Sequence, residues 1–223
     1  MPSSIHFYQD QVLAGGASEP IKGCDRILFC RFGEVRVNGE VLLAGDARYV
    51  GDKLTVEGIS DWSQIWRWEV DLPNSEKTLL PGMGVLSQHR MSRVITMLAM
   101  EDGTEWCFRL DQITAPKGRV SDPHKHPGPG IRCMVEGTFN VQQDVENARN
   151  ILPGEPWWEC GEQLVIAWGS KTMHAKFLRG LVLPADKFGA PETIQNAKGQ
   201  PNKKRGHFRL LVDQLITAKG DGT

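Results

Sequence analysis

The chain has 223 residues, with 26 Lys and Arg against 27 Asp and Glu, so its formal net charge is -1. A nearly neutral chain gives no electrostatic reason to bind nucleic acid or an anionic membrane, and its basic cluster at 203–205 is expected to be a solvated loop. No apolar run approaches the roughly 20 residues of a membrane-spanning helix, and the first residues do not form a secretory signal. No C-x-x-C pair is present. We therefore expect a cytoplasmic protein with reduced cysteines.

Short apolar runs separated by Gly, Pro, Asn and Asp follow one another along the chain and predict short β-strands. Within residues 34–43, Asn38-Gly39 lies between two such runs. Both residues tolerate a positive φ, so this pair predicts a hairpin. Further along, Trp66 and Trp68 alternate with charged residues, which places both indoles on one face of a strand.

Two further segments in the middle of the chain predict a linker and a turn. The segment Leu72–Gly84, with its two prolines, is the best linker candidate. Asp102-Gly103 lies between the apolar runs 94–99 and 105–110 and predicts a second hairpin.

Helical signals are weak. Asp144–Asn150 could form a turn or two of helix. The apolar spacing of His207–Ala218 fits an amphipathic helix, although its β-rich start also suits a strand. Many short strands at regular spacing therefore predict an all-β sandwich or barrel.

A weak internal repeat accompanies this pattern. Residues 32–37 resemble residues 136–141, and each segment is followed by a Gly-acid pair and another apolar run. The repeat predicts a duplicated β unit, with residues 1–104 as one half and residues 105–223 as the other.

The clearest chemical signal is the triplet His124-Lys125-His126. On a strand, residues two apart point to the same face, so both imidazoles would project together into a barrel. Neutral imidazole binds Fe, Ni, Cu, Zn and Mn, and a Pro-Gly-rich bend followed by the apolar run 131–135 places the pair beside a core strand.

At these residues the sequence resembles the cupin family. The first cupin motif, G-x5-H-x-H-x3,4-E-x6-G, matches at Gly118, His124, His126 and Gly137 with its spacing intact. The position of the motif's glutamate is occupied by Gly130.

The second cupin motif, G-x5-P-x-G-x2-H-x3-N, is degraded. Gly161 and Gly169 are kept, Ala167 replaces the proline, and a histidine arrives two residues late, at His174. The resemblance covers roughly residues 105–185, and the first half resembles a cupin that has lost its histidines.

This resemblance implies a duplicated double-stranded β-helix, or jelly-roll barrel, with a metal held by His124, His126 and His174. Three-histidine sites occur in cupin dioxygenases, so the resemblance implies a metal-dependent enzyme that acts on a small organic molecule. The reaction that it favours most is that of an Fe(II) dioxygenase. Mn, Ni and Zn are the alternative metals. A non-catalytic small-molecule-binding cupin and a metal-dependent isomerase or lyase remain alternatives, because a fold does not fix a reaction.

Several other residues are candidates for the pocket. Gln163, Glu162 or Glu136 could supply the further ligand in place of His174, and Arg132, Trp168 and Gln163 are candidate substrate-binding residues. We also expect a homodimer, because β proteins must protect their sheet edges, and neither nucleic acid nor a membrane as a partner.

Overall fold

The computed structural model describes residues 3–71, 77–96, 103–190, 195–196 and 206–217. The chain divides into two compact units, with the boundary between Val94 and Ile95 rather than after residue 104. Within the described residues the fold is all-β, and the only helical element is the 3-10 turn η1 (Ala185–Lys187). None of the helical structure found in these residues is long and apolar enough to cross a membrane.

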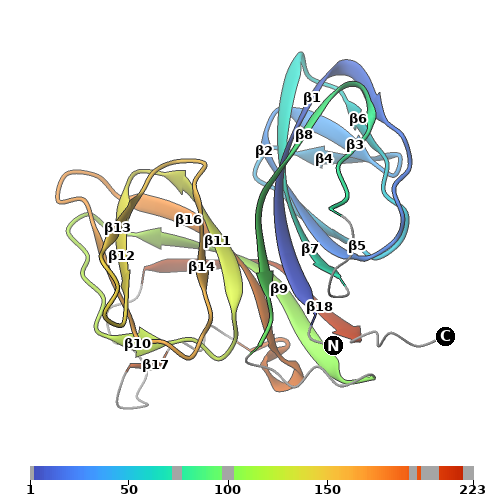
Figure 1. Ribbon diagram of the computed structural model, residues 1–223. Coiled ribbons are helices and arrows are strands. Elements are labelled where there is room, and N and C mark those ends of the chain that lie inside the picture. Colours follow the sequence, from blue (N-terminus) through green and yellow to red (C-terminus); the bar gives the residue numbers. More distant parts are fainter. Residues whose placement is uncertain (1–2, 72–76, 97–102, 191–194, 197–205, 218–223) are drawn as a thin grey trace. The chain divides into compact units, whose positions relative to one another are not determined.

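Unit 1, which ends at Val94, consists of eight antiparallel strands (Figure 1). They are β1 (Ser4–Ser18), β2 (Asp25–Phe32), β3 (Glu34–Val37), β4 (Glu40–Leu43), β5 (Ala47–Val50), β6 (Val56–Gly58), β7 (Trp62–Asp71) and β8 (Gly82–Val94). The strands follow the order β4-β3-β6-β1-β7-β2-β5, and β8 also pairs with β1.

Unit 2 begins at Ile95 and contains two five-stranded sheets among its described residues. Its strands are β9 (Glu105–Ala115), β10 (His124–Lys125), β11 (Gly130–Glu136), β12 (Phe139–Gln143), β13 (Arg149–Ile151), β14 (Pro156–Glu159), β15 (Val165–Gly169), β16 (Ala175–Pro184), β17 (Gln195–Asn196) and β18 (His207–Thr217). The sheet orders are β13-β12-β15-β10-β17 and β14-β11-β16-β9-β18.

The two units share one strand order. The run β5-β2-β7-β1, with β8 beside β1, corresponds position by position to β14-β11-β16-β9-β18. The weak internal repeat of the sequence has the same backbone geometry in both units. Gly33 follows β2 with φ 70° and Gly137 follows β11 with φ 74°, a backbone region that favours glycine. This is the arrangement that a duplicated β unit would produce.

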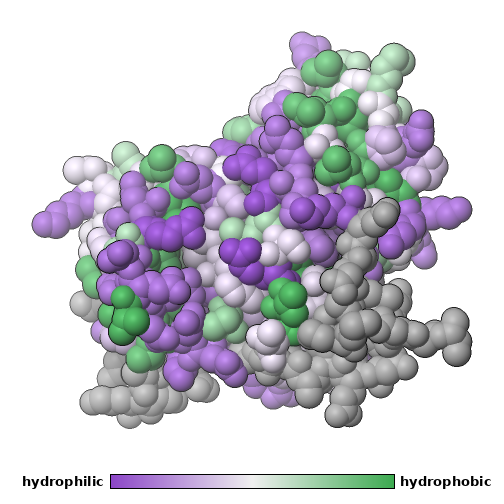
Figure 2. Space-filling model, viewed as in Figure 1, coloured by the Kyte–Doolittle hydropathy of each residue, from purple (hydrophilic) through white to green (hydrophobic). Residues whose placement is uncertain are grey.

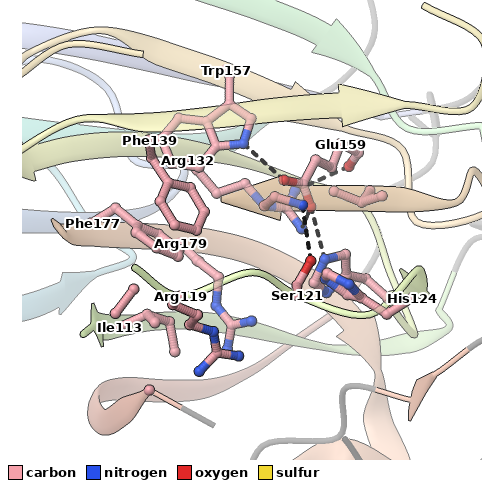
Figure 3. Close-up of a pocket in the computed structure, with 15 residues that line it drawn as sticks. Ile113, Arg119, Ser121, His124, Arg132, Phe139, Trp157, Glu159, Phe177 and Arg179 are labelled. Carbon is pink, nitrogen blue, oxygen red and sulfur yellow. Dashed lines mark hydrogen bonds and ion pairs between the residues drawn. The ribbon is translucent and has the colours of Figure 1, made fainter. Parts of the chain in front are cut away.

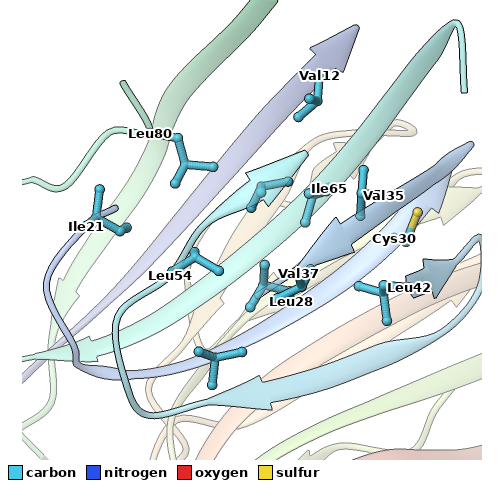
Figure 4. Close-up of a cluster of buried hydrophobic side chains, with 12 residues drawn as sticks. Val12, Ile21, Leu28, Cys30, Val35, Val37, Leu42, Leu54, Ile65 and Leu80 are labelled. Carbon is cyan, nitrogen blue, oxygen red and sulfur yellow. The ribbon is translucent and has the colours of Figure 1, made fainter. Parts of the chain in front are cut away.

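Alternating side chains build the core of each unit. In β3, Val35 and Val37 are buried whereas Glu34 and Arg36 are exposed. Figure 4 shows the resulting cluster in unit 1, where Leu28 of β2 and Ile65 of β7 point into the same apolar interior as these valines. A comparable cluster in unit 2 includes Met134, Phe139, Trp157 and Phe177.

The first hairpin expected from the sequence is confirmed, because Asn38 and Gly39 have φ values of 49° and 85° between the paired strands β3 and β4. The second is wrong. Strand β8 pairs with β1, whereas β9 is already flanked by β16 and β18, so no edge of β9 is left for β8. Asp102 itself lies outside the described residues.

Other expectations also need correction. His207–Thr217 is the strand β18 and not a helix, because pairing with β9 satisfies its backbone groups. Arg149–Ile151 within the other weak helical region forms β13. Leu72–Gly84 lies inside unit 1 and does not join the units, although residues 72–76 are outside the described residues. The basic cluster at 203–205 is outside them as well.

Large exposed hydrophobic side chains occur in both units, for example Trp62 and Leu86 in unit 1 and Val120 and Met173 in unit 2. The face shown in Figure 2 has groups of hydrophobic residues between hydrophilic ones. The homodimer expected from the sequence stays a prediction.

Unit 1 buries a network of charged side chains beside its apolar core. Arg67 Nε lies 2.9 Å from Asp10 Oδ2, and its guanidinium also bonds to Glu69. Arg26 Nε lies 2.8 Å from Glu69 Oε1. The ring of Tyr8 lies under the Arg67 guanidinium, 4.0 Å from ring centre to Cζ. Two arginines and two carboxylates thus balance one another without solvent.

Replacing Arg67 by methionine should destabilise unit 1 by about 3–5 kcal/mol, because two buried carboxylates lose a partner. The free energy of unfolding is measured by urea denaturation with tryptophan fluorescence. The control is Arg36→Met, which removes an exposed arginine 4.0 Å from Glu57 and should change stability by less than about 0.5 kcal/mol. Equal effects of the two substitutions would contradict the role given to the network.

Candidate ligand-binding site

A pocket opens in unit 2, with an empty volume of about 530 Å³ that includes the space open to solvent. Its apolar lining comprises Ile113, Ala115, Phe139, Trp157, Val165, Ala167 and Phe177, and its polar lining comprises Arg119, Ser121, His124, His126, Arg132, Glu159 and Arg179 (Figure 3). Residues two apart on β14, β15 and β16 alternate with outward-facing neighbours, so the strand pleat itself delivers these side chains to the interior.

The two histidines of the H-x-H triplet lie together in this pocket. His124 and His126 are each 7% exposed, and their ring centres are 5.0 Å apart. His124 Nδ1 lies 2.8 Å from the carbonyl oxygen of Asp122. Because a carbonyl only accepts, Nδ1 carries the proton and donates it, which leaves the lone pair on Nε2. Burial lowers the pKa of His124, so the ring is neutral at neutral pH.

His126 is tied to a buried carboxylate. Its Nε2 lies 2.8 Å from Glu159 Oε2, and Trp157 Nε1 donates to Glu159 Oε1 at 2.8 Å. Burial lowers the pKa of His126 to about 3, against the opposing effect of Glu159, so this imidazole is also neutral. Glu159 is ionised. Burial alone would raise the pKa of Glu159. The charge of Arg132, 2.9 Å away, and the hydrogen bonds to His126 and Trp157 outweigh that effect and lower the pKa below its ordinary value.

Strand pairing explains how Glu159 reaches this place. It lies on β14 directly opposite Gly130 of β11. Gly130 is the position at which the first motif would carry its glutamate, so the neighbouring strand supplies a carboxylate beside a position that has no side chain. Arg132 also donates to the carbonyl oxygens of Gly130 and Glu159, and burial lowers its pKa to about 10, which leaves it charged at neutral pH.

A second ion pair supports the opposite wall. Arg179 of β16 lies opposite Asp111 of β9, and its Nε and Nη2 contact the two oxygens of that carboxylate at 2.7 and 2.9 Å. In Figure 3 the guanidinium groups of Arg179 and Arg119 point toward the same part of the pocket. Three arginines, Arg119, Arg132 and Arg179, therefore line the pocket.

Comparison with known proteins used the fold, because no protein-family model and no curated protein matches the sequence. Similar solved structures include oxalate decarboxylase from Bacillus subtilis, a protein with Mn(II) centres (TM-score 0.57, 11% identity, 81% of this chain and 69% of that chain). Oxalate decarboxylase from Lactobacillus farciminis is similar as well (TM-score 0.57, 12% identity, 80% of this chain and 77% of that chain). AerE from Microcystis aeruginosa has a TM-score of 0.54 and 13% identity, over 79% of this chain and 87% of that chain. The chain has the cupin fold. At these identities the likeness shows the fold alone.

The three-histidine cupin site expected from the sequence is not assembled. His174 lies in the turn before β16, with its side chain 58% exposed and its Nε2 3.4 Å from Glu136 Oε2. It therefore points away from the pocket that contains His124 and His126, because its late position in the second motif places it outside the inward-facing register of β16.

A cupin metal also does not fit the donors that are present. Among the described residues, no group of three or more His, Cys, Asp or Glu side chains could hold a metal ion. The carboxylate nearest to the histidine pair, Glu159, is already paired with Arg132, and a divalent cation would lie beside that guanidinium. We therefore assign no metal to the pocket.

The structure separates the other candidates. Arg132 lines the pocket as expected. Trp168 does not, because Val165 and Ala167 occupy the inward positions of β15 and leave Trp168 on the opposite face. Gln163 lies outside the pocket and contacts Cys160.

Five residues of the polar site escaped the sequence analysis: Asp111, Arg119, Ser121, Glu159 and Arg179. Arg119 and Ser121 fall inside the first cupin motif, between Gly118 and His124, which was the available signal. The other three lie on strands whose charged residues resemble those of any solvated strand face, and only pairing across the barrel brings them inside.

The stability of the protein should fall below neutral pH. Folded His126 has a pKa of about 3, below its ordinary value of 6.5, so the unfolded chain binds a proton that the folded chain does not. This group's contribution is fully present above pH 6.5 and decreases as the pH falls toward 3. By pH 5 the loss from His126 is about 2 kcal/mol.

The variant His126→Gln, which keeps a donor for Glu159, should lose less stability between pH 7 and pH 5 than the wild type in urea denaturation. His174→Gln, which changes an exposed histidine, should behave like the wild type. An unchanged pH dependence in His126→Gln would show that His126 is not buried as a neutral ring.

Proposed function

We propose that unit 2 binds a small molecule that carries one carboxylate and an apolar body. The three guanidinium groups in the pocket lining, those of Arg119, Arg132 and Arg179, carry this proposal. Guanidinium groups favour a planar carboxylate, because their parallel N–H groups match its two oxygens.

The apolar wall indicates the rest of the ligand. The rings of Phe139 and Phe177 have centres 5.3 Å apart, and Trp157 meets Phe177 edge-on at 5.4 Å. Aromatic walls bury flat apolar groups well, so an aryl or branched alkyl carboxylate suits the space better than a bare inorganic anion. The formate complex of the Lactobacillus farciminis oxalate decarboxylase gives limited support, because formate is also a small carboxylate.

The metal-dependent alternatives have weaker support. The Fe(II) dioxygenase implied by the resemblance requires a third ligand, and His174 is on the surface. Mn, Ni and Zn would face the same incomplete donor set. The dioxygenase therefore stays a prediction without a ligand set, and the small-molecule-binding cupin is the alternative that the pocket favours.

Calorimetric titration should show that phenylacetate binds at least about tenfold more tightly than phenylacetamide, which has the same shape without the charge. Arg119→Gln should weaken phenylacetate binding about tenfold while leaving the amide unaffected, because Arg119 lines the pocket and is not part of the core.

The matched control is Lys117→Gln, which removes a positive charge from an exposed residue of the same segment that does not line the pocket. Its affinity should stay within about twofold of the wild type. Equal binding of phenylacetate and phenylacetamide would refute the anion site.

Phenylacetate affinity should be unchanged after treatment with EDTA and gel filtration, because arginines and not a metal are proposed to hold the carboxylate. Metal content is measured by plasma mass spectrometry before and after treatment. Binding that disappears with EDTA and returns with Mn(II), Fe(II), Ni(II) or Zn(II) would show that a metal holds the anion and would contradict the argument from the donor set.

A further inference from the structure

One sheet of unit 2 changes from charged to apolar along its inner face. Side chains directly opposite one another on β14, β11, β16 and β9 form a charged row: Trp157, Arg132, Arg179 and Asp111. Two residues further along the same strands lies an apolar row: Met134, Phe177 and Ile113. Two residues beyond it, Ala175 lies opposite Ala115. All of these side chains are buried, so the sheet gives the interior a charged end and an apolar end.

The strand pleat sets the distance between these rows. A strand advances about 3.4 Å per residue, so Ala115 lies roughly 14 Å along the sheet from the charged row. Glu159 lies two residues beyond Trp157 on β14, on the side of the charged row away from Ala115. Figure 3 shows the rings of Phe139 and Phe177 together at one end of the site and Glu159 at the other. The apolar space therefore extends from the charged row toward Ala115.

The charged row has a donor for the carboxylate. Arg132 and Arg179 lie directly opposite each other on β11 and β16, and both line the pocket. Arg132 Nε is buried and has no hydrogen-bond partner among the residues that the structure describes. A buried N–H without an acceptor is unfavourable, and an oxygen atom of a bound ligand supplies the missing acceptor.

The far end of the apolar space is lined by small residues. Ala115 and Gly206 both line the pocket, and a Cβ atom at Gly206 would lie 3.3 Å from Ala115 Cα. The same Cβ atom would lie 2.5 Å from the carbonyl oxygen of Thr114, so a larger residue at Gly206 would move the backbone. The size of the side chain at Ala115 therefore decides how far a ligand reaches beyond Phe177.

We propose that the preferred ligand is an unbranched acid with a terminal aryl group that lies along the strands, and that Ala115 sets the longest chain accepted; this inference rests on the proposed carboxylate site. The carboxylate accepts a hydrogen bond from Arg132 at the charged row. The methylene chain passes Phe177 and Ile113, and the aryl ring reaches Ala115. An acid as short as phenylacetate leaves the space beside Ala115 unfilled, so the ligand class is arylalkanoates with a longer chain.

The test is calorimetric titration of the full-length protein with phenylacetate and 4-phenylbutanoate. Each buried methylene strengthens binding about fourfold, so the wild type should bind 4-phenylbutanoate at least about tenfold more tightly than phenylacetate. Ala115→Val places a larger side chain at the far end. It should weaken 4-phenylbutanoate binding about tenfold and leave phenylacetate within about threefold of the wild type, which also shows that the variant is folded.

A second variant tests the same residue without adding volume. Ala115→Gly removes the methyl group and should bind 6-phenylhexanoate about fivefold more tightly than the wild type. The control is Ala190→Leu, at a partly exposed residue outside the pocket lining, which should match the wild type for all three acids. Equal affinity of the wild type for phenylacetate and 4-phenylbutanoate, or no gain for 6-phenylhexanoate in Ala115→Gly, would overturn this inference and leave the carboxylate site standing. Failure of the wild type to bind any of the three acids would refute the proposed function as well.

Discussion

A buried arginine held by an aspartate across two central strands is the constraint on which the rest of each unit depends. Arg67 meets Asp10 between β7 and β1, and Arg179 meets Asp111 between β16 and β9. A guanidinium in a barrel interior is tolerable only when a carboxylate faces it at hydrogen-bond distance, so each pair demands one strand alignment and disfavours every other. A shift of one residue would turn these charges outward and their apolar neighbours with them.

The two units differ in how the charge is balanced beyond that pair. In unit 1, Arg26 and Arg67 face Glu69 and Asp10, so the network is closed on itself. In unit 2, Arg132 faces Glu159 and Arg179 faces Asp111, and Arg119 lines the same pocket. Both interiors thus hold buried arginine–carboxylate pairs, and in unit 2 a pocket opens beside them.

The position of Glu159 changes the chemistry of the H-x-H pair. Placed opposite Gly130, its carboxylate lies between His126 and Arg132 and serves as their common partner. His126 is thereby engaged, whereas His124 bonds to the carbonyl oxygen of Asp122. Burial lowers the pKa of both rings, so both are neutral at neutral pH. A site with the histidine motif of a metal centre thus contains an ion-paired carboxylate from the neighbouring strand.

The sequence by itself determined what depends on neighbours along the chain. Alternation predicted the strands, Asn38-Gly39 predicted its hairpin, and the spacing of His124 and His126 predicted two imidazoles on one face of a cupin barrel. Only the tertiary structure decided which distant strands pair. That pairing made His207–Thr217 a strand, left His174 on the surface and brought Glu159 and Arg179 inside. The physical reason is that a β-ladder joins residues far apart in sequence, and local periodicity states which face a side chain occupies but not what lies opposite.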